Sequence, residues 1–453
     1  MLCFYQIRFI LSGSNRLFWQ TTSLRCYGTS TLKKEAGVQE KAYPYRSGNM
    51  LYNILPENLP EKCRKMDATS LITGKVPPRQ VQMLVRDFIE DSLYNPFYGY
   101  YSKQACILST PMPFEFSKMK NNNSFYKELS RIYAGCDKAT TQEGIQYPKQ
   151  LWHTPTELFK PYYGEAIARY LLAHYKLSYY PYDDLRIYEV GSGNGTLMFN
   201  ILDYLRNVDP DVYTRTKYCA IEISHSLAAQ QVKTLKSTKS YHEHQEKIEI
   251  VNKNIFDWNT LDPNPCFFIL LEVLDNFPHD LIRYNPITQQ PYQAIALIDE
   301  IGDIHEFYSP NLDPLIIKYL SIKKKITQEY NHRYKTFFYF LKRLKTLLPF
   351  SENLIDPEFI PTKQLILFDV LRNYFPQHKL IISDFSSLPE GIQGINAPLV
   401  QTRLSGITIP CSTYLVKQGK FLEHWGDTKI TRTISGENPM LDWFENVKFL
   451  ITQ

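Results

Sequence analysis

A glycine-rich turn carries the strongest chemical signal in this chain. Glu189-Val190-Gly191-Ser192-Gly193-Asn194-Gly195 stands between a strand-like apolar run, Leu185–Val190, and a helix-like stretch, Leu197–Leu205. Glycines in such a turn let the backbone approach a ligand, because no Cβ is in the way. Residue 196 is Thr196, which excludes a dinucleotide fingerprint, and no Gly-Lys-Ser/Thr follows, which excludes a phosphate-binding P-loop. The acidic Glu189 would repel phosphate and attract an amino group or a sulfonium, so the predicted binding residues are Glu189, Gly191, Ser192, Gly193, Asn194 and Gly195.

A second acidic residue, Glu222, follows the next predicted strand, Tyr218–Ile221. A carboxylate at the end of the second strand can accept hydrogen bonds from both hydroxyls of a ribose. Glu222 lies 222 − 195 = 27 residues past the last glycine, compared with roughly 20 in dinucleotide-binding folds, and the polar loop Asn207–Arg215 accounts for the difference. The alternative is that Glu222 is a surface residue that closes a strand.

A pair of carboxylates, Glu272 and Asp275, follows the predicted strand Phe267–Leu271. Arginine meets carboxylates through its planar fork of donors, so an acidic pair at the carboxyl end of a central strand suits an arginyl substrate. We predict that Glu272 and Asp275 are the catalytic residues. Alternatively, Asp275 caps a following helix.

Cysteine and histidine spacing gives no metal site. The eight cysteines contain no CxxC pair, which argues against a zinc ribbon or a redox dithiol. His242 and His244 have no third ligand nearby. We therefore predict no metal.

Composition excludes two further classes of protein. The 453 residues are 43% hydrophobic, enough to bury a core, but the longest strictly apolar run, Cys266–Leu271, is far shorter than the roughly 20 residues of a membrane-spanning helix. The net charge is +5, and removing residues 1–27 with their three arginines leaves 5 − 3 = +2. A near-neutral protein lacks the basic face of a nucleic-acid binder, so we predict neither membrane insertion nor a nucleic-acid partner.

The N-terminal segment is basic and contains no acidic residue before Glu35. Apolar residues, serines and arginines in this arrangement are typical of a mitochondrial transit peptide. Arg25-Cys26-Tyr27 before Gly28 resembles a matrix-protease cleavage site. We predict that residues 1–27 are a transit peptide and that the mature protein is in the mitochondrial matrix; the alternative is a frayed basic end.

The remaining chain divides into segments of different character. Residues 28–76 are polar and predict a linker. Pro77-Pro78 opens a predicted helix with apolar residues from Val81 to Ile89, and a second helix is predicted over Gly164–Tyr175. We assign residues 77–180 to an N-terminal helical and substrate region, with an irregular insertion at 103–150 whose loop tip is Asn121–Asn123, and residues 419–453 to a C-terminal tail.

From residue 185 strands and helices alternate, which predicts an α/β domain over residues 181–418. Alternation of this kind gives a mainly parallel sheet with helices on both faces and a ligand at the carboxyl ends of the strands. Within it, Ala294–Ile298 and Ile304–Tyr308 predict a hairpin. Further predicted elements are a strand at Ile248–Val251, a helix over Leu365–Tyr374 and a strand at Leu380–Ile382.

The ordered motifs resemble the MidA-type mitochondrial methyltransferases, which include the protein-arginine methyltransferase acting in respiratory complex I assembly. The resemblance covers residues 77–417 and implies a Rossmann-like, seven-stranded class I methyltransferase sheet, S-adenosylmethionine as cofactor, and symmetric dimethylation of an arginine in a mitochondrial protein. The motifs that carry it are Leu93-Tyr94-x-Pro96-x-x-Gly99-Tyr100-Tyr101, Thr154-x-x-Glu157 with Gly164, the glycine turn, Glu222-x-Ser224-x-x-Leu227, Glu272-x-x-Asp275-x-x-Pro278 and Ser383-Asp384-Phe385.

One residue departs from the family pattern. The family commonly has a polar residue, often Asn, where this chain has Leu271 before Glu272. The departure removes one polar group beside the predicted substrate carboxylate. It keeps open an alternative function, a catalytically weak or inactive assembly factor with a methyltransferase fold that acts by binding a protein.

Overall fold

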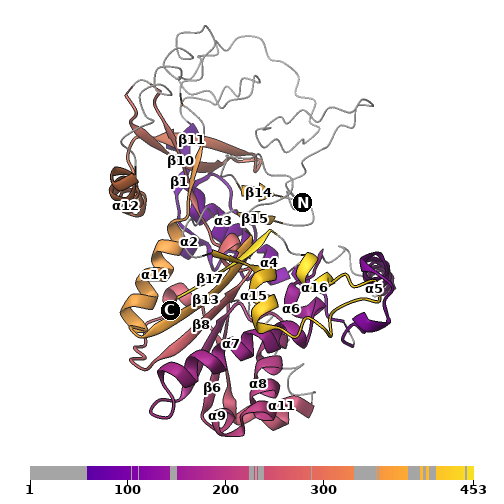
Figure 1. The fold of residues 1–453 in the computed structure, drawn as a ribbon. Coiled ribbons are helices and arrows are strands. Elements are labelled where there is room, and N and C mark those ends of the chain that lie inside the picture. The colour runs from indigo at the N-terminus through magenta and orange to yellow at the C-terminus, as the bar shows by residue number, and fades with distance from the viewer. Residues whose placement is uncertain are drawn as a thin grey trace. The chain divides into compact units, whose positions relative to one another are not determined.

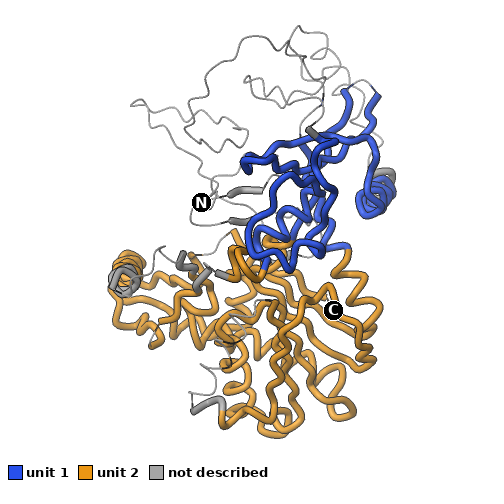
Figure 2. The backbone as a smooth tube through the Cα atoms, turned by 180° about the vertical axis from the view of Figure 1, so that it is seen from behind, with its two compact units in different colours: residues 1–95, 278–365 blue, residues 96–277, 366–453 orange. Residues whose placement is uncertain are grey.

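The computed structural model describes two compact units, drawn in different colours in Figure 2. One unit comprises residues up to 95 together with 278–365, and the other comprises residues 96–277 and 366–453. The predicted transit peptide and most of the predicted linker lie outside the described residues. The described residues are 59–103, 105–110, 112–142, 150–223, 229, 232, 239–286, 288–330, 354, 357–385, 398–400, 405–407, 415–443 and 446–452.

The second unit is an α/β structure built on a seven-stranded sheet of described residues, with the order β16-β17-β13-β8-β5-β6-β7. Strands β17, β13, β8 and β6 of this sheet are labelled in Figure 1. The five strands from β13 to β7 run parallel, whereas β17 is antiparallel to both β13 and β16. The predicted α/β alternation is thereby confirmed. The strands are β5 (Leu185–Val190), β6 (Thr216–Glu222), β7 (Ile248–Asn252), β8 (Cys266–Leu271), β13 (His378–Phe385), β16 (Leu415–Lys417) and β17 (Val447–Ile451).

Helices cover both faces of this sheet because its central strand is apolar on both sides. Side chains alternate between the faces of a strand. In β8, Phe267 and Ile269 therefore join one buried cluster and Phe268 and Leu270 another. The first cluster includes residues of α7 (Tyr162–Ser178), α8 (Thr196–Val208) and α15 (Gln418–Trp425), and the second includes residues of α14 (Thr362–Tyr374).

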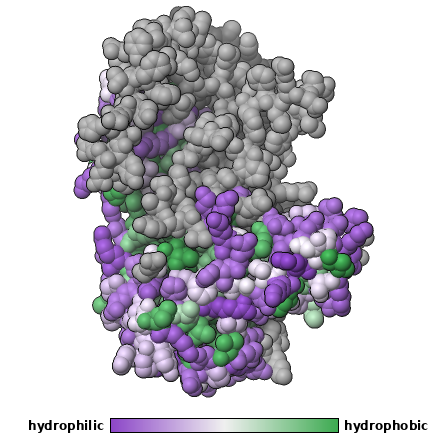
Figure 3. All heavy atoms as spheres, viewed as in Figure 1, coloured by the Kyte–Doolittle hydropathy of each residue, from purple (hydrophilic) through white to green (hydrophobic). Residues whose placement is uncertain are grey.

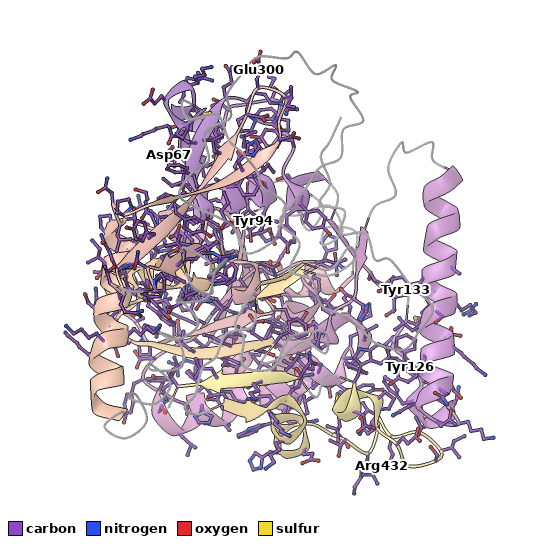
Figure 4. The ribbon with its side chains drawn as sticks, turned by 90° about the horizontal axis from the view of Figure 1, so that it is seen from above. Asp67, Tyr94, Tyr126, Tyr133, Glu300 and Arg432 are labelled. Atoms are coloured by element: carbon purple, nitrogen blue, oxygen red, sulfur yellow. The ribbon has the colours of Figure 1, made fainter. Side chains whose placement is uncertain are left out.

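Shorter elements surround the sheet of the second unit. They include a helix of 21 residues, α5 (Asn122–Gln142), within the segment predicted to be an irregular insertion. Tyr126 and Tyr133 lie on this helix (Figure 4), and the ring of Tyr126 packs 4.6 Å from that of Trp443. The others are α4 (Tyr100–Lys103), β3 (Ala105–Ile107), η1 (Phe116–Lys118), β4 (Gln150–Trp152), α6 (Pro155–Leu158), α9 (Pro210–Thr214), α11 (Lys239–His244), η2 (Gln245–Lys247), η3 (Ile255–Asp257), η4 (Leu274–Asn276), β14 (Pro398–Val400), β15 (Ser405–Ile407) and α16 (Pro439–Asp442).

The first unit contains a six-stranded sheet of described residues with the order β1-β2-β10-β9-β12, in which β11 pairs with β10. Arg86 joins its elements, because its guanidinium lies 2.7 Å from Asp280 and 2.8 Å from Asp313. The elements are α1 (Leu59–Lys62), β1 (Arg64–Lys65), α2 (Ala68–Leu71), β2 (Val81–Leu84), α3 (Val85–Tyr94), β9 (Asp280–Tyr284), β10 (Pro291–Ile298), β11 (Ile304–Ser309), α12 (Pro314–Tyr330) and β12 (Glu358–Ile360).

Three sequence predictions about these segments need correction. The helix predicted from Pro77 begins only at Val85, because Val81 and Met83 alternate inward as a strand that pairs with β10. The predicted Asn121–Asn123 loop tip is a helix start, where Asn121 Oδ1 accepts a hydrogen bond from the Ser124 amide. Residues 419–453 are no separate tail, because β17 pairs with β13.

The predicted domain boundaries also differ from the two units. The predicted hairpin is present as β10 and β11, but it belongs to the sheet of the first unit. Residues 278–365 therefore cluster with residues before 96 instead of with the rest of 181–418. Alternation along the sequence does not reveal that one stretch of strands joins another sheet.

The described surface mixes polar and apolar residues. On the face shown in Figure 3, hydrophobic residues form small groups separated by hydrophilic ones. Among the helices of the described residues, none combines the length and the apolar character needed to cross a bilayer.

Replacing Gly164 with alanine tests how closely α7 and α8 pack. A Cβ at this position would lie 2.5 Å from the Cβ of Asn200, so the two helices would have to move apart. We expect Gly164→Ala to lower the free energy of unfolding by about 1–3 kcal/mol in urea denaturation. Gly419→Ala on α15 is the control, because its added carbon has its nearest neighbour 3.5 Å away. An equal loss in both variants would contradict the packing.

Candidate active site

A cavity of about 490 Å³, part of it open to solvent, lies where the carboxyl ends of the strands meet α6 and the start of α8. It brings together six of the predicted residues: Glu189, Gly191, Ser192, Gly193, Asn194 and Glu272. Three others, Gly195, Glu222 and Asp275, are not in its lining. The remaining lining residues are Ile107, Thr154, Pro155, Thr156, Glu157, Tyr163, Thr196, Leu197 and Leu271.

The glycine turn has a backbone conformation that favours glycine. Gly191, Gly193 and Gly195 have φ values of +73°, +51° and +76°, a left-handed region that other residues rarely adopt. The Gly195 amide donates to the Ser192 carbonyl at 2.8 Å, and Gly195 is the N-cap of α8. A Cβ on Gly193 would lie 2.7 Å from Cδ1 of Ile107, across the cavity wall. Larger side chains would therefore both strain the turn and fill the space beside it.

Glu189 and Glu222 lie on neighbouring strands at this edge of the sheet. Both are buried, with 5% and 4% exposed. The Tyr218 hydroxyl donates a hydrogen bond of 2.9 Å to Glu189 Oε2. Burial raises the pKa of Glu189 to about 7, and the negative charge of Glu222 contributes to the rise. Glu222 is therefore close enough to act on Glu189, and the alternative that it is a surface residue is wrong.

Glu272 follows β8 directly and has a φ of +54°, which is uncommon for a residue with a side chain. Its amide donates to the Ser383 carbonyl at 2.7 Å, which fixes this backbone. The residue is partly buried, and its Oε1 atom has no access to water and no hydrogen-bond partner among the described residues. Burial, with Asp384 nearby, raises the pKa of Glu272 to about 8. Such strained positions cluster at functional sites.

Asp275 lies behind Glu272 in a short turn, η4, held by hydrogen bonds. Asp384 Oδ2 accepts from the Asp275 amide at 3.1 Å, and Asn276 Nδ2 donates to Asp275 Oδ1 at 2.7 Å. Burial raises the pKa of Asp275 well above its ordinary value and that of Asp384 to about 7. Asp275 lies within η4, whose N-cap is Val273, so the alternative that it caps a helix is wrong.

Two of the lining residues that were not predicted as site residues carry polar groups into the cavity wall, namely Glu157, which was named only as part of a family motif, and Tyr163. Glu157 is 2% exposed, and its Oε1 accepts hydrogen bonds from Asn194 Nδ2 at 2.9 Å and Thr196 Oγ1 at 2.6 Å. Thr154 and Glu157 have the spacing of a capping box, but only Thr154 caps α6, while the Glu157 carboxylate points at the glycine turn. Tyr163 is fully buried on α7 and had no distinguishing sequence signal.

Glu272→Gln tests the raised pKa of Glu272. Between its ordinary value of 4.5 and about 8, the folded protein holds a proton that the unfolded chain releases, so wild-type stability falls as pH rises through this range. Glutamine carries no such proton. We expect the variant to melt above the wild type, by a margin that grows from about pH 5 to about pH 9, roughly 2–4 °C for each kcal/mol gained. Exposed Glu249→Gln should show no such trend, and a constant margin for Glu272→Gln would contradict the burial.

Comparison with known proteins identifies the family to which the chain is similar. Residues 166–421, more than half of the chain, match the family described as "Putative S-adenosyl-L-methionine-dependent methyltransferase". The curated "Protein arginine methyltransferase NDUFAF7 homolog, mitochondrial" of Schizosaccharomyces pombe is 28% identical over 332 residues, which cover 71% of this chain and 67% of that protein.

Solved structures show weaker similarity. A Burkholderia thailandensis protein bound to S-adenosyl-homocysteine is 14% identical over 67% of this chain and 58% of its own, with a TM-score of 0.41. A glycopeptide N-methyltransferase, MtfA, complexed with sinefungin is 12% identical over 55% of this chain and 59% of its own, with a TM-score of 0.24. The chain thus spans less than two thirds of the length of each solved structure.

The family match and the curated relative confirm the resemblance drawn from the sequence motifs. S-adenosylmethionine is the cofactor of the matched family. The chain belongs to the S-adenosylmethionine-dependent methyltransferases of the MidA type.

Proposed function

We propose that this protein is a protein-arginine N-methyltransferase of the mitochondrial matrix that symmetrically dimethylates an arginine of a mitochondrial protein during respiratory complex assembly. The name of the Schizosaccharomyces pombe relative supports the arginine substrate and the mitochondrial location, and the predicted transit peptide supports the matrix. The observation that carries the proposal is the buried Oε1 of Glu272, which has no hydrogen-bond partner among the described residues and lies in the wall of the glycine-turn cavity. The seven-stranded sheet then corresponds to the class I methyltransferase sheet.

The residues of the cavity fit the methyl donor. The left-handed glycines leave room where the donor would lie, and a Cβ on Gly193 would enter that room. Gly191, Ser192, Gly193 and Asn194 would shape the pocket directly, and Gly195 would do so through the turn that it closes. Glu189 would face the charged part of the donor. Glu222, at the end of β6 and outside the lining, would hold the ribose hydroxyls where the donor extends beyond this cavity. When bound, S-adenosylmethionine supplies a methyl group attached to a positively charged sulfur.

Glu272, in the cavity lining, would contact the guanidinium of the substrate, and Asp275, in the adjacent turn η4 outside the lining, would add negative charge near it. A carboxylate matches the planar fork of arginine donors, and Glu272 would orient one nitrogen for in-line attack on the methyl carbon. Such positioning contributes on the order of 7–11 kcal/mol, so no covalent intermediate on the protein is needed. The guanidinium nitrogen loses a proton around the transfer. The nearby guanidinium charge would favour the ionised form of Glu272, whose Oε1 would then accept that proton. The carboxylates also stabilise the charge that moves from sulfur to arginine.

The alternative, a non-catalytic assembly factor, rests on Leu271. This apolar residue lines the cavity next to Glu272, where the family commonly has a polar residue. Its side chain can neither donate nor accept a hydrogen bond, so it cannot help to orient a guanidinium. Donor binding without methyl transfer would favour this second function.

Gly193→Val tests the donor pocket. The substitution forces a β-branched residue into a left-handed conformation and adds carbon atoms on the cavity side. We expect calorimetry to show binding of S-adenosylmethionine to the wild type and at least a roughly 100-fold loss for Gly193→Val, since strain and obstruction add. Gly436→Val is the matched control, because Gly436 has a φ of +90° but nothing within 4 Å of its Cβ position. Retained binding in Gly193→Val, or an equal loss in Gly436→Val, would count against the pocket.

Glu272→Gln tests the substrate site. We expect transfer of labelled methyl from S-adenosylmethionine to a mitochondrial extract to fall by at least roughly 100-fold, because the variant loses the charge that faces the guanidinium and the acceptor of its proton. Donor affinity should stay within roughly threefold of the wild type. Exposed Glu249→Gln should transfer at the wild-type rate. Label on a residue other than arginine, or undiminished transfer, would overturn the assignment.

A further inference from the structure

Glu157 occupies an unusual position at the start of α8. Its Oε1 accepts hydrogen bonds from Asn194, in the glycine turn, and from Thr196, the first residue of α8. Its Oε2 lies 3.0 Å from Nζ of Lys160. The side chain is 3% exposed, so this carboxylate has little access to water. A buried negative charge therefore stands at the N-terminal end of a helix of 13 residues and lines the cavity.

The N-terminal end of a helix attracts anions, because its first amides are unpaired and the helix dipole is positive there. In dinucleotide-binding folds, the pyrophosphate of the ligand takes this place after the first strand. Here the anion at the start of α8 is the Glu157 carboxylate of the chain itself. Two hydrogen bonds and an ion pair hold it in place. A ligand phosphate entering the same end of α8 would meet a buried negative charge.

A second acid in the cavity wall also disfavours a ligand that carries phosphate groups. Glu189 lines the cavity beside Glu157, and it is buried with a hydrogen bond from Tyr218. Two carboxylates on one cavity favour a ligand with positive groups over one with further negative groups, since like charges repel strongly in a poorly hydrated space. S-adenosylmethionine carries a sulfonium, an ammonium and one carboxylate and is cationic overall, whereas ADP carries the same adenosine with a strongly anionic diphosphate.

We propose that Glu157 is a specificity-determining residue that occupies the anion position at the start of α8, so that the cavity accepts cationic nucleosides and rejects nucleotide phosphates. The inference rests on the proposed donor pocket, but it needs neither methyl transfer nor an arginine substrate. The proposed role also gives a function to the hydrogen bonds that join α6 to the glycine turn and to the start of α8.

The test compares two ligands on the full chain. Dissociation constants for S-adenosylmethionine and ADP are measured by calorimetry or competition in the wild type, in Glu157→Gln and in Glu165→Gln. Glutamine keeps an oxygen to accept from Asn194 and Thr196 but removes the charge. We expect the ratio of the ADP constant to the S-adenosylmethionine constant to fall by roughly tenfold or more in Glu157→Gln, the effect of one charge-assisted interaction. Glu165→Gln, which removes a partly buried acid paired with Arg169 outside the cavity, should leave the ratio unchanged.

Lys160→Gln provides a second test, in which the ratio of dissociation constants should change in the opposite direction. This test remains available even if Glu157→Gln does not fold. Removing the ammonium leaves the Glu157 carboxylate less neutralised, so the ratio should rise by roughly threefold or more. A wild type that binds no S-adenosylmethionine would overturn the donor pocket and this inference together. Normal donor binding with an unchanged ratio in both Glu157→Gln and Lys160→Gln would overturn this inference alone.

Discussion

The cavity depends on one geometric constraint: parallel strands bring their carboxyl ends to the same edge of a sheet. In this protein four neighbouring strands each carry an acid at that edge, namely Glu189 on β5, Glu222 on β6, Glu272 after β8 and Asp384 on β13. Burial raises the pKa values of Glu189 and Asp384 to about 7 and that of Glu272 to about 8. Burial disfavours the charged form of Glu189, Glu272 and Asp384, so a positively charged ligand at this edge would offset part of that cost.

The sequence predicted the central sheet well and its neighbours poorly. Central parallel strands are buried on both faces, so they read in the sequence as short, mainly apolar runs bounded by turn residues. Leu185–Val190 is one such run, and it could be recognised as a strand from the sequence alone. The helix predicted over Val81–Leu84 was wrong, because the apolar residues there fit a helical and an alternating pattern equally well. Only the pairing with β10 makes this segment a strand. For the same reason, the sequence did not show which sheet the hairpin of β10 and β11 would join, because that depends on pairing with distant strands.

The candidate site was predictable where residue type and local spacing carry the information. Three glycines after a strand predict left-handed backbone, and the structure has it at each of them. Glu157 was named only as part of a family motif and not as a site residue, because nothing in the sequence tells that its carboxylate turns to the start of another helix. Tyr163 was missed for a different reason: a buried tyrosine among other helical aromatics has no pattern of its own until the fold places it beside Glu272.

The position of β17 sets when the sheet can be completed. β13 ends at Phe385 and β17 begins at Val447, so 446 − 385 = 61 residues lie between two strands that pair side by side. Until β17 is in place, one edge of β13 lacks its partner, and an open edge is a template for aggregation. Chaperones that shield extended apolar segments would matter most for this protein before Val447–Ile451 reaches β13.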